Sequence, residues 1–508
     1  MSAKRTAYAL HSWTGLLAGW LLFVICLTGT LVVYKFPLKA LANPQLAASA
    51  PVDRLGPDKA LARFEAAARD MRVRVVAFPS DAYSIHQYSI IAETPAGKEK
   101  RYWINPETGA VRDSLESDFA DFIQRLHAGL FMGRIGRWIV GALGVAMVVS
   151  IVAGLVFHWP RLRRDAFHLR LGAHRRKAWS DLHKMGGVWA LAFHLVIALT
   201  GAWLGLEGLV GIRASAASPI ELAGEGPGQP LPIAQIVQRA QALRPDFTPT
   251  HVNFTHRGAA GSTIRVQGDL PGPRLVQRGQ TMLVFDADTG RHLQTVDRTA
   301  QGGGRRLLAM MRPLHYGYFW PGVGELLYFL LGGVSTLLAA SGLFIWAERE
   351  RRKRHPKDPD AVIGMERANA GIMGGLIVAL TAMALLHGLA RLSPGFSAIG
   401  AFRFLGSQDV FSSRAMAPEL PVFLGFWALA ACLLAGCSPL RAWRHVLVAT
   451  TAALLGLVAL TSAGARGTML TGAAAGYGAA CLLLALACFL TIRRLRQPGA
   501  ARPTSSTQ

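Results

Sequence analysis

Two histidines precede apolar runs that share one spacing. His11 lies seventeen residues before Thr28, and His183 lies seventeen residues before Thr200; a glycine follows each threonine. Such a recurrence indicates an internal repeat. Imidazole nitrogens are common metal ligands, so a histidine held at the same place in both copies is a candidate ligand.

A second pair of histidines recurs at the other ends of the same units. His127 and His315 both lie in a Leu-His-x-Gly-x-Phe segment, and glycines follow each of them at nine and twenty-seven residues. These glycines are Gly136 and Gly154 in the first copy and Gly324 and Gly342 in the second. One histidine therefore marks each end of the apolar segments in both copies.

The apolar runs predict eight membrane-spanning helices, since a span needs about twenty apolar residues. They cover residues 8–34, 134–157, 184–208, 320–347, 369–390, 418–437, 444–463 and 468–491. Arg and Lys cluster beside these runs, and the positive-inside rule then places both termini in the cytoplasm. The first run is longer than the apolar core of a signal peptide, so we interpret it as a retained helix.

Composition agrees with a protein that is partly in the membrane and partly in water. The 508 residues are 51% hydrophobic, and the formal net charge is +24. Because the basic residues cluster beside apolar runs, they indicate membrane orientation rather than nucleic-acid binding. The five cysteines lie in or beside apolar runs without a disulfide or CxxC pattern, so we interpret them as small buried hydrophobic residues.

Two long segments between spans, about 35–133 and 209–319, are predicted to be small α+β domains on the outer side. Residues 102–109 and 283–290 are both typical of a strand that enters an Asn or Asp turn closed by glycine. An amphipathic helix is predicted before each of these fragments, at residues 57–72 and 232–243.

The fold class is therefore an integral-membrane α-helical protein with two outer α+β domains and a parallel internal duplication. The predicted parts are repeat 1 at 1–160, repeat 2 at 161–350, a basic linker at 351–368, a four-helix extension at 369–491 and a cytoplasmic tail at 492–508.

Parallel repeats are related by an axis along the membrane normal, which brings equivalent positions together. His11 would then face His183 (the inner pair), and His127 would face His315 (the outer pair). Two facing imidazoles are the ligand set of a six-coordinate b haem, so we predict two haems, roughly 25–30 Å apart along the helices. The alternative is that each histidine has its polar tip in the headgroup layer.

Other residues are weaker candidates. His194 is predicted to lie in mid-span, where a titratable group is a functional hypothesis, but its repeat equivalent is Leu22. It could be a haem ligand, relay a proton or bond a nearby hydroxyl. Arg134, Arg137 and Arg312 flank the outer pair and could bind haem propionates, or reach to lipid phosphate.

These residues resemble the PepSY-associated transmembrane family, which includes iron-regulated inner-membrane proteins and ferrisiderophore reductases. The resemblance covers about residues 5–350 and rests on the Leu-His starts with Thr-Gly ends, the Leu-His-x-Gly segments and the two Asp/Asn-x-x-Thr-Gly hairpins. It implies a Gram-negative inner membrane, periplasmic PepSY domains and, in the reductase members, two b haems that pass electrons outward to an iron-siderophore.

We therefore predict a two-haem membrane oxidoreductase that reduces a periplasmic ferric siderophore with electrons from an unidentified cytoplasmic donor. No nucleotide-binding or hydrolase motif is visible in the chain. Two other functions remain open: a non-redox membrane protein whose PepSY-like domains bind or regulate a partner, and a transporter component for siderophore or iron.

Overall fold

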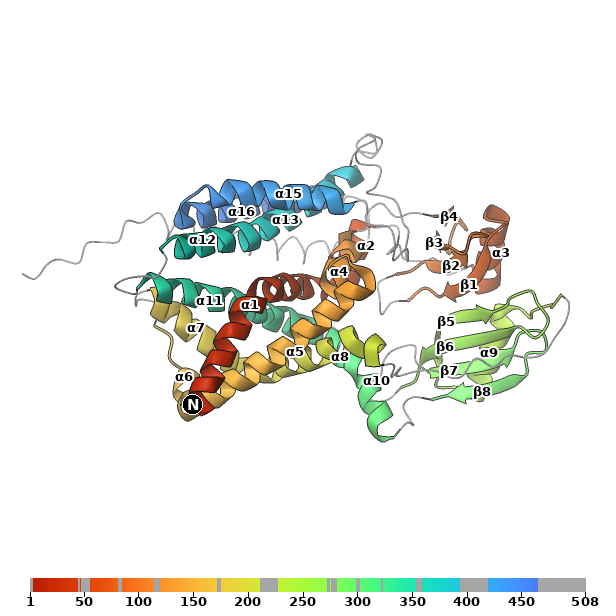
Figure 1. The fold of residues 1–508 in the computed structure, drawn as a ribbon. Helices are drawn as coiled ribbons and strands as arrows, with labels where there is room; N and C mark the ends of the chain where they lie inside the picture. The colour runs from red at the N-terminus through yellow and green to blue at the C-terminus, as the bar shows by residue number, and fades with distance from the viewer. Residues whose placement is uncertain are drawn as a thin grey trace, which may run out of the picture. The chain divides into compact units, whose positions relative to one another are not determined.

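The computed structural model describes residues 3–43, 46, 55–80, 85–113, 119–170, 175–210, 227–271, 275, 281–297, 302–320, 323–352, 359–392 and 419–464. The chain divides into two compact units, and the boundary falls inside a long helix after Gly342. The first unit holds predicted repeat 1 and most of predicted repeat 2, and the second holds the end of that repeat and the C-terminal helices (Figure 1).

Five helical segments of the described residues are long and apolar enough to cross a membrane. Four of them contain α1 (Ala3–Val32), α5 (Gly133–His158), α8 (Leu191–Val210) and α11 (Val323–Arg351); the fifth contains α12 (Pro359–Asn369) and α13 (Gly375–Leu392). They correspond to the first five predicted spans, so the protein is a multi-pass membrane protein.

The three remaining predicted spans are not settled in the same way. Two of them coincide with the apolar helices α15 (Glu419–Ala435) and α16 (Pro439–Gly464), which are not among the five candidates. The last, at 468–491, lies outside the described residues. The total of eight spans therefore stays a prediction.

The third predicted span is made of two helices rather than one. Helix α7 (Arg175–Trp189) ends at a turn at Ala190, and α8 continues from Leu191. Backbone hydrogen bonds still run from Ala190 to Gly186 and from His194 to Ala190. His183 consequently lies in the middle of α7 and not at the beginning of α8.

Helices α5 and α8 approach one another closely through small residues. A Cβ atom added to Gly205 would lie 2.5 Å from the Cα atom of Gly141, and one added to Gly144 would lie 2.6 Å from the backbone nitrogen of Ala202. Such contacts let two helix backbones pack at short range in a membrane. The two predicted repeats are thus joined along these helices.

The two predicted outer domains form one eight-stranded sheet. The first half contains α3 (Pro57–Ala67) and β1 (Arg72–Ala77), β2 (Tyr88–Glu93), β3 (Glu99–Ile104) and β4 (Val111–Arg112). The second contains α9 (Ile233–Leu243) and β5 (Thr248–Thr255), β6 (Thr263–Asp269), β7 (Thr281–Asp286) and β8 (His292–Val296). The strand order is β4-β3-β2-β1-β5-β6-β7-β8.

The prediction of two separate domains is corrected by the pairing of β1 with β5. These strands are antiparallel, and Val76 lies opposite Val252. Each half alone would leave a strand edge with unpaired backbone groups, and joining the two edges satisfies them. Both halves have the same element order, one helix and four strands.

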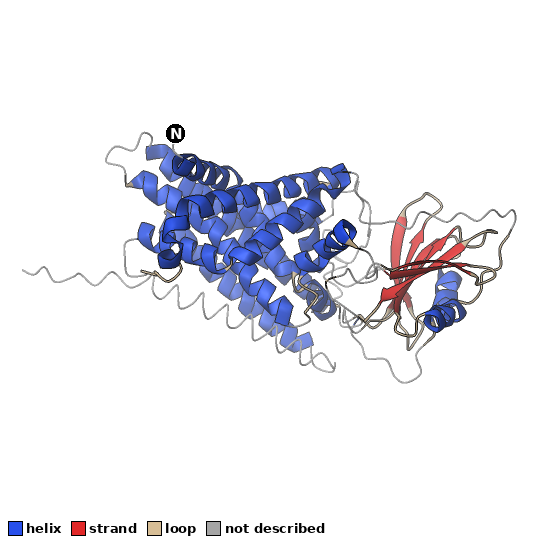
Figure 2. Ribbon diagram, turned by 90° about the horizontal axis from the view of Figure 1, so that it is seen from below, coloured by secondary structure: helices blue, strands red, loops and turns tan. Residues whose placement is uncertain are grey.

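One face of this sheet carries its apolar core. Helices α3 and α9 lie against this face (Figure 2) and contribute Phe64 and Ile236, which pack with Val76, Val252 and Leu283 from the strands. All five side chains are completely buried. Alternate residues of the strands consequently point to the opposite, more polar face.

The two predicted turns are present. The side-chain oxygen of Asn105 accepts hydrogen bonds from the backbone N–H groups of Glu107 and Thr108, and Asp286 does the same in the second half. Gly109 and Gly290 close the turns at φ of 70° and 68°. Glycine adopts this left-handed conformation without a steric penalty.

A carboxylate from the first half caps a helix of the second. Asp58 accepts hydrogen bonds from the backbone N–H groups of Ile233 (2.6 Å) and Ala234 (2.9 Å) at the start of α9. We expect Asp58→Ala to destabilise the sheet domain by about 1–2 kcal/mol, because a helix N-terminus loses an anionic cap. The expected result is faster amide hydrogen exchange in α9 and an unchanged exchange rate in α1. An unchanged exchange rate in α9 would contradict the prediction.

The C-terminal unit packs around a widened helical turn. A π-helical segment, Ala370–Gly374, joins α12 to α13, and the indole of Trp427 on α15 donates a hydrogen bond to the carbonyl of Ile372 (3.0 Å). A π turn disturbs the regular helical hydrogen bonds, so an outside donor stabilises it. His387 is buried on α13, and nothing in this unit assigns it a role.

Candidate functional site

The outer pair meets at the ends of two helices that the sequence analysis did not predict. His127 lies on α4 (Phe119–Gly129) and His315 on α10 (Gly303–Tyr316), which precede α5 and α11. The imidazole ring centres are 6.1 Å apart, with 26° between the ring planes. Apolar residues three or four apart, such as Phe119, Phe122 and Leu126, were the signal that could have identified α4.

The inner pair is formed in the same way from α1 and α7. The ring centres of His11 and His183 are 6.1 Å apart, with 79° between the planes. Phe157 on α5 packs against His11 at 5.8 Å, and Tyr8 packs on Phe157 at 5.4 Å. The structure therefore brings together both pairs that the repeat predicted.

The spacing within each pair can be compared with that of two ligands on one metal. An imidazole nitrogen lies about 2 Å from the metal that it binds, with its ring centre about 1 Å further, so two ligands on opposite sides have centres about 6 Å apart. Both pairs have this separation. The two pairs fit a group that is held by one histidine from each side.

Hydrogen bonds to backbone carbonyls fix the tautomer of one histidine in each pair. Nδ1 of His127 bonds the carbonyl of Ile25 at 3.0 Å, and Nδ1 of His11 bonds the carbonyl of Ser150 at 2.8 Å. A carbonyl oxygen only accepts, so each Nδ1 must carry the proton. The lone pair of the neutral ring is then on Nε2, which is the atom a metal would bind.

Hydroxyl groups fix the tautomer of the other two histidines. Nδ1 of His315 lies 3.0 Å from the Thr200 hydroxyl, and Nδ1 of His183 lies 2.9 Å from the Ser341 hydroxyl. Both hydroxyls donate their own proton to helix carbonyls, those of Val196 and Leu338. They therefore accept from Nδ1, and a histidine that ligates a metal is commonly oriented by such a bond.

Among the described residues, no hydrogen-bond partner is found for Nε2 of any of these four histidines. In every case, the group that bonds Nδ1 belongs to the same predicted repeat as the histidine. Each pair is thus built from two equivalent half-sites. Groups of three or more His, Cys, Asp or Glu side chains that could hold a bare metal ion do not occur in the described part of the chain.

Four glycines lie against the four imidazoles, and three of them are closer than an added Cβ atom would ordinarily allow. A Cβ atom on Gly29 would lie 2.8 Å from Cε1 of His127, and one on Gly201 would lie 3.2 Å from Cε1 of His315. At the inner pair, Gly154 is 3.1 Å from His11 and Gly342 is 3.7 Å from His183 by the same measure. The Thr-Gly ends and the glycines at twenty-seven residues in the sequence pattern therefore contact the histidines.

The two pairs lie at different levels of α1. His11 belongs to the inner pair, whereas Ile25 and Gly29 contact the outer pair fourteen and eighteen residues later. At 1.5 Å per residue these contacts are about 21–27 Å apart along the helix. This separation approaches the thickness of the hydrocarbon core of a bilayer, about 30 Å.

The arginines near the outer pair differ in their surroundings. Arg134 and Arg137 are exposed at the beginning of α5. Arg312 donates a hydrogen bond to Glu207 at 3.0 Å, so its charge is already paired with a carboxylate of α8. The prediction that these three residues bind haem propionates is untested, and Arg312 is the weakest of them.

His194 belongs to neither pair. It lies on α8 with 2% of its surface exposed, and its ring contacts Phe193 at 5.9 Å. Its Nε2 atom is buried without a hydrogen-bond partner among the described residues. His194 therefore does not replace either member of the inner or outer pair in this structure.

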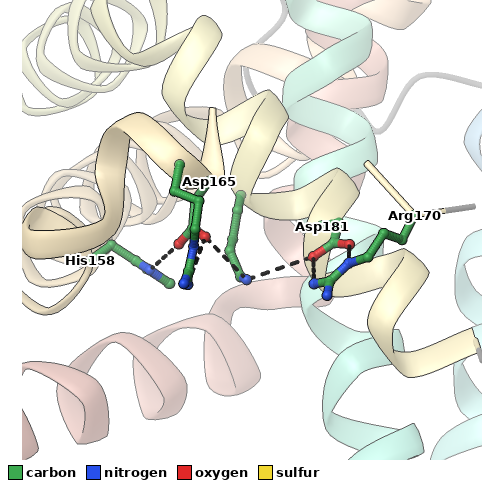
Figure 3. Close-up of polar contacts among 6 residues, drawn as sticks. His158, Asp165, Arg170 and Asp181 are labelled. Carbon is green, nitrogen blue, oxygen red and sulfur yellow. Dashed lines mark hydrogen bonds and ion pairs between the residues drawn. The ribbon is translucent and has the colours of Figure 1, made fainter. Parts of the chain in front are cut away.

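Two aspartates that the sequence analysis missed organise the chain next to the inner pair. Asp165, 5% exposed, ends α6 (Leu162–Asp165), and Asp181, 2% exposed, lies two residues before His183 on α7. The nitrogen of Lys184 lies 3.7 Å from Asp165 and 3.8 Å from Asp181, and links them (Figure 3). They were overlooked because each is enclosed by a long basic run.

Further partners complete this ionic cluster. Arg170 forms two hydrogen bonds with Asp181, at 2.8 and 3.0 Å, and these bonds lower the pKa of the Asp181 carboxyl. Asp165 lies 3.2 Å from Nδ1 of His158 and 3.6 Å from Arg164. The cluster fixes the chain that leaves α5 against the helix that carries His183.

The sheet carries a polar row on the face away from α3 and α9. Asn253, Arg265 and Gln294 lie on neighbouring strands in register, with Val284 between the last two. The amide nitrogen of Asn253 and the amide oxygen of Gln294 are buried without a hydrogen-bond partner among the described residues. Buried polar atoms are normally paired, so these two atoms depart from the usual pattern.

Comparison of this chain with known proteins identifies its family. The family model of the PepSY-associated TM region matches residues 8–349. The chain belongs to this family. It is also 30% identical to the uncharacterized protein PA4219 of Pseudomonas aeruginosa over 357 residues, which are 64% of this chain and 87% of the relative. The family match ends at residue 349, a few residues inside the second unit, which begins at Leu343.

Proposed function

We propose that this protein is a two-haem electron-transfer protein of the bacterial inner membrane. It would carry electrons from the cytoplasmic side to the periplasm and reduce Fe(III) in a ferric siderophore to Fe(II), with both termini in the cytoplasm. The observation that carries the proposal is that all four paired histidines have Nδ1 bonded and Nε2 available.

The residues that would hold the two haems are the inner pair and the outer pair. A b haem supplies one-electron chemistry at each level, because its iron changes between Fe(III) and Fe(II). The protein orients each imidazole through Nδ1, and Gly29, Gly154 and Gly201 leave space that a larger side chain would fill. The fit therefore concerns the ligand atoms, which are the Nε2 atoms of the two pairs.

The arrangement also explains why the levels are separate. Apolar helices surround both pairs, and the contacts of the two pairs with α1 are about 21–27 Å apart. Low polarity and exclusion of water are among the means by which a protein sets a reduction potential. In this proposal, electrons would pass between the two levels through the apolar helices that separate them.

The outer acceptor would be a chelate of hard oxygen ligands around Fe(III). Reduction to Fe(II) lowers the charge of the metal and weakens its bonds to such ligands, which releases iron. Arg265, on the face of the sheet away from α3 and α9, would offer a positive charge to such a chelate. Tyr316, 43% exposed, has its ring centre 5.8 Å from that of His315 and would contact the same acceptor.

The decisive experiment is a reduced-minus-oxidised visible spectrum of the purified full-length protein, with a pyridine haemochrome assay. Two b haems per chain are expected. One haem would mean that only one pair is a ligand pair. If protein expressed with adequate haem contains none, the electron-transfer proposal fails, and a non-redox protein that binds or regulates a partner becomes the better account.

A change at Thr200 tests the orientation of the outer pair. Thr200→Val removes the acceptor for Nδ1 of His315. Loss of a residue that orients a metal ligand typically weakens metal binding, so we expect haem at this level to bind about 10–100-fold more weakly. Thr28→Val is the matched control, because His127 bonds the Ile25 carbonyl instead. Equal rates of haem transfer from the two variants to a haem scavenger would contradict the prediction.

A further inference from the structure

An apolar pocket lies between α7, α11 and the segment that follows α6. Its volume is about 480 Å³, and it is lined by Ala166, Phe167, Met185, Gly186, Trp189, Ala190, Leu331 and Val334. This size is within the range of about 300–1,000 Å³ that is usual for small-molecule sites. Every lining side chain is apolar or aromatic, so the pocket suits a ligand that is soluble in lipid.

Aromatic rings form one wall of the pocket. Phe167 and Trp189 pack edge to face with their ring centres 5.5 Å apart, and both side chains are largely exposed in the protein alone, at 74% and 67%. The indole of Trp189 donates a hydrogen bond to the carbonyl of Ala166 at 2.8 Å, which holds this wall in place. Fixed, accessible rings of this kind can stack on a planar aromatic ligand.

The pocket is close to the inner pair. Met185, Gly186 and Trp189 follow His183 on α7 by two, three and six residues. Along the axis of a helix these steps are about 3–9 Å. A bound ring would therefore lie within about two helical turns of the histidine that the proposed function assigns to the inner haem.

The ionic cluster adjoins the pocket along the chain. Asp165 immediately precedes the lining residues Ala166 and Phe167, and it contacts His158 and Lys184. Oδ2 of its buried carboxylate lies 3.2 Å from Nδ1 of His158, and Oδ1 lies 3.7 Å from the nitrogen of Lys184. Apolar walls, an aromatic surface and one polar edge together match a ring with hydroxyl groups and a hydrocarbon tail.

We propose that this pocket binds an isoprenoid quinol of the membrane, and that the quinol is the electron donor of the protein. The inference rests on the proposed function, which needs a reductant on the inner side, and it names the class of that reductant. The quinol ring would lie against Phe167 and Trp189, with its hydroxyl groups toward Asp165 and its tail toward lipid.

The overall reaction balances with the acceptor of the proposed function. One quinol loses its two O–H hydrogens and becomes a quinone; its two electrons reduce two Fe(III) chelates to Fe(II), and its two protons leave to water on the inner side. The ionic cluster of Asp165, Asp181 and Lys184 provides polar groups between the pocket edge and that water. No other oxidant or reductant is required.

The test measures quinone binding directly, so that it does not depend on haem or on activity. The full-length protein in lipid nanodiscs is photolabelled with an azido-ubiquinone, with and without an excess of decylubiquinone, and labelled peptides are mapped by mass spectrometry. We expect label on peptides of α7 and α11 that the competitor removes. Label spread over many lipid-facing helices without competition would show only that quinone dissolves in the lipid, and would overturn the proposal.

Two variants of neighbouring residues sharpen the test. Leu331 lines the pocket, whereas Leu330 is 57% exposed and is not a lining residue. Leu331→Phe should lower the competed label by about tenfold, which corresponds to about 1.4 kcal/mol, and Leu330→Phe should not change it. Equal labelling in the two variants would overturn the pocket assignment.

A second measurement separates this inference from the proposed function. Protein that contains two haems should be reduced by decylubiquinol more slowly in Leu331→Phe than in Leu330→Phe, while dithionite reduces both equally. Two haems without competed label would refute the quinol site and leave the proposed function intact. Competed label in a protein that holds no haem would refute the proposed function and leave the quinone site.

Discussion

His315→Ala is expected to remove one of two b haems and to lower outward reduction of the ferric acceptor by at least about 100-fold. The variant loses an iron ligand, and loss of only an outer-shell partner already costs about 10–100-fold in metal affinity. The haem content and the rate of Fe(III) reduction in proteoliposomes measure the two effects. His127→Ala should behave in the same way, since the two rings are partners at 6.1 Å.

The control for these variants is a histidine on the sheet. His292 is exposed on β8, and its Nε2 atom bonds the hydroxyl of Thr295 at 2.8 Å. His292→Ala should retain both haems and full activity. Normal haem content and normal reduction in His315→Ala would refute the assignment of the outer pair.

The second large effect on the outer haem is expected from Gly29→Ala, which adds one methyl group beside His127. In Gly29→Ala the new Cβ atom would lie 2.8 Å from Cε1 of His127, which is shorter than Cβ contacts in real proteins, and 3.1 Å from Nδ1, which is tighter than most of them. The imidazole must move, and its bond to the Ile25 carbonyl is lost. We expect the outer haem to be lost or its absorption spectrum to shift, although alanine favours an α-helix by about 1 kcal/mol over glycine.

Two matched substitutions separate this clash from a general effect on helices. Gly15 is on the same helix with nothing within 4 Å of an added Cβ, and Gly342 faces His183 at an ordinary contact distance of 3.7 Å. Gly15→Ala and Gly342→Ala should leave the spectrum unchanged and the melting temperature equal or higher. A wild-type spectrum in Gly29→Ala would show that the outer histidine does not occupy the position described.

Much of the candidate site could be predicted because a repeat carries long-range information. Parallel copies predict that equivalent residues meet at an axis, and the structure brings both histidine pairs to 6.1 Å. The role of the repeated Thr-Gly ends was less visible. Only the structure reveals that Thr200 accepts the Nδ1 proton of His315 while Thr28, its equivalent, leaves this task to a backbone carbonyl.

Other features depend on contacts that no local pattern encodes. The pairing of β1 with β5 joins strands more than 170 residues apart, and either strand alone has only the alternation of a half-buried strand. Asp165 and Asp181 are single acids within basic runs, and their burial against Lys184 depends on how the chain returns after α5. The membrane topology beyond α13 also stays a prediction, because apolar length alone does not settle it.

The groups that orient each histidine come from one half of the chain, and this suggests how the arrangement could be assembled. Every histidine of the two pairs takes its Nδ1 bond and its glycine from its own half of the chain, but its partner histidine from the other half. A single unduplicated half would therefore contain every orienting group and no complete pair. Two such chains related by a two-fold axis would complete both levels at once, so a homodimer of half-length chains could form the same two pairs.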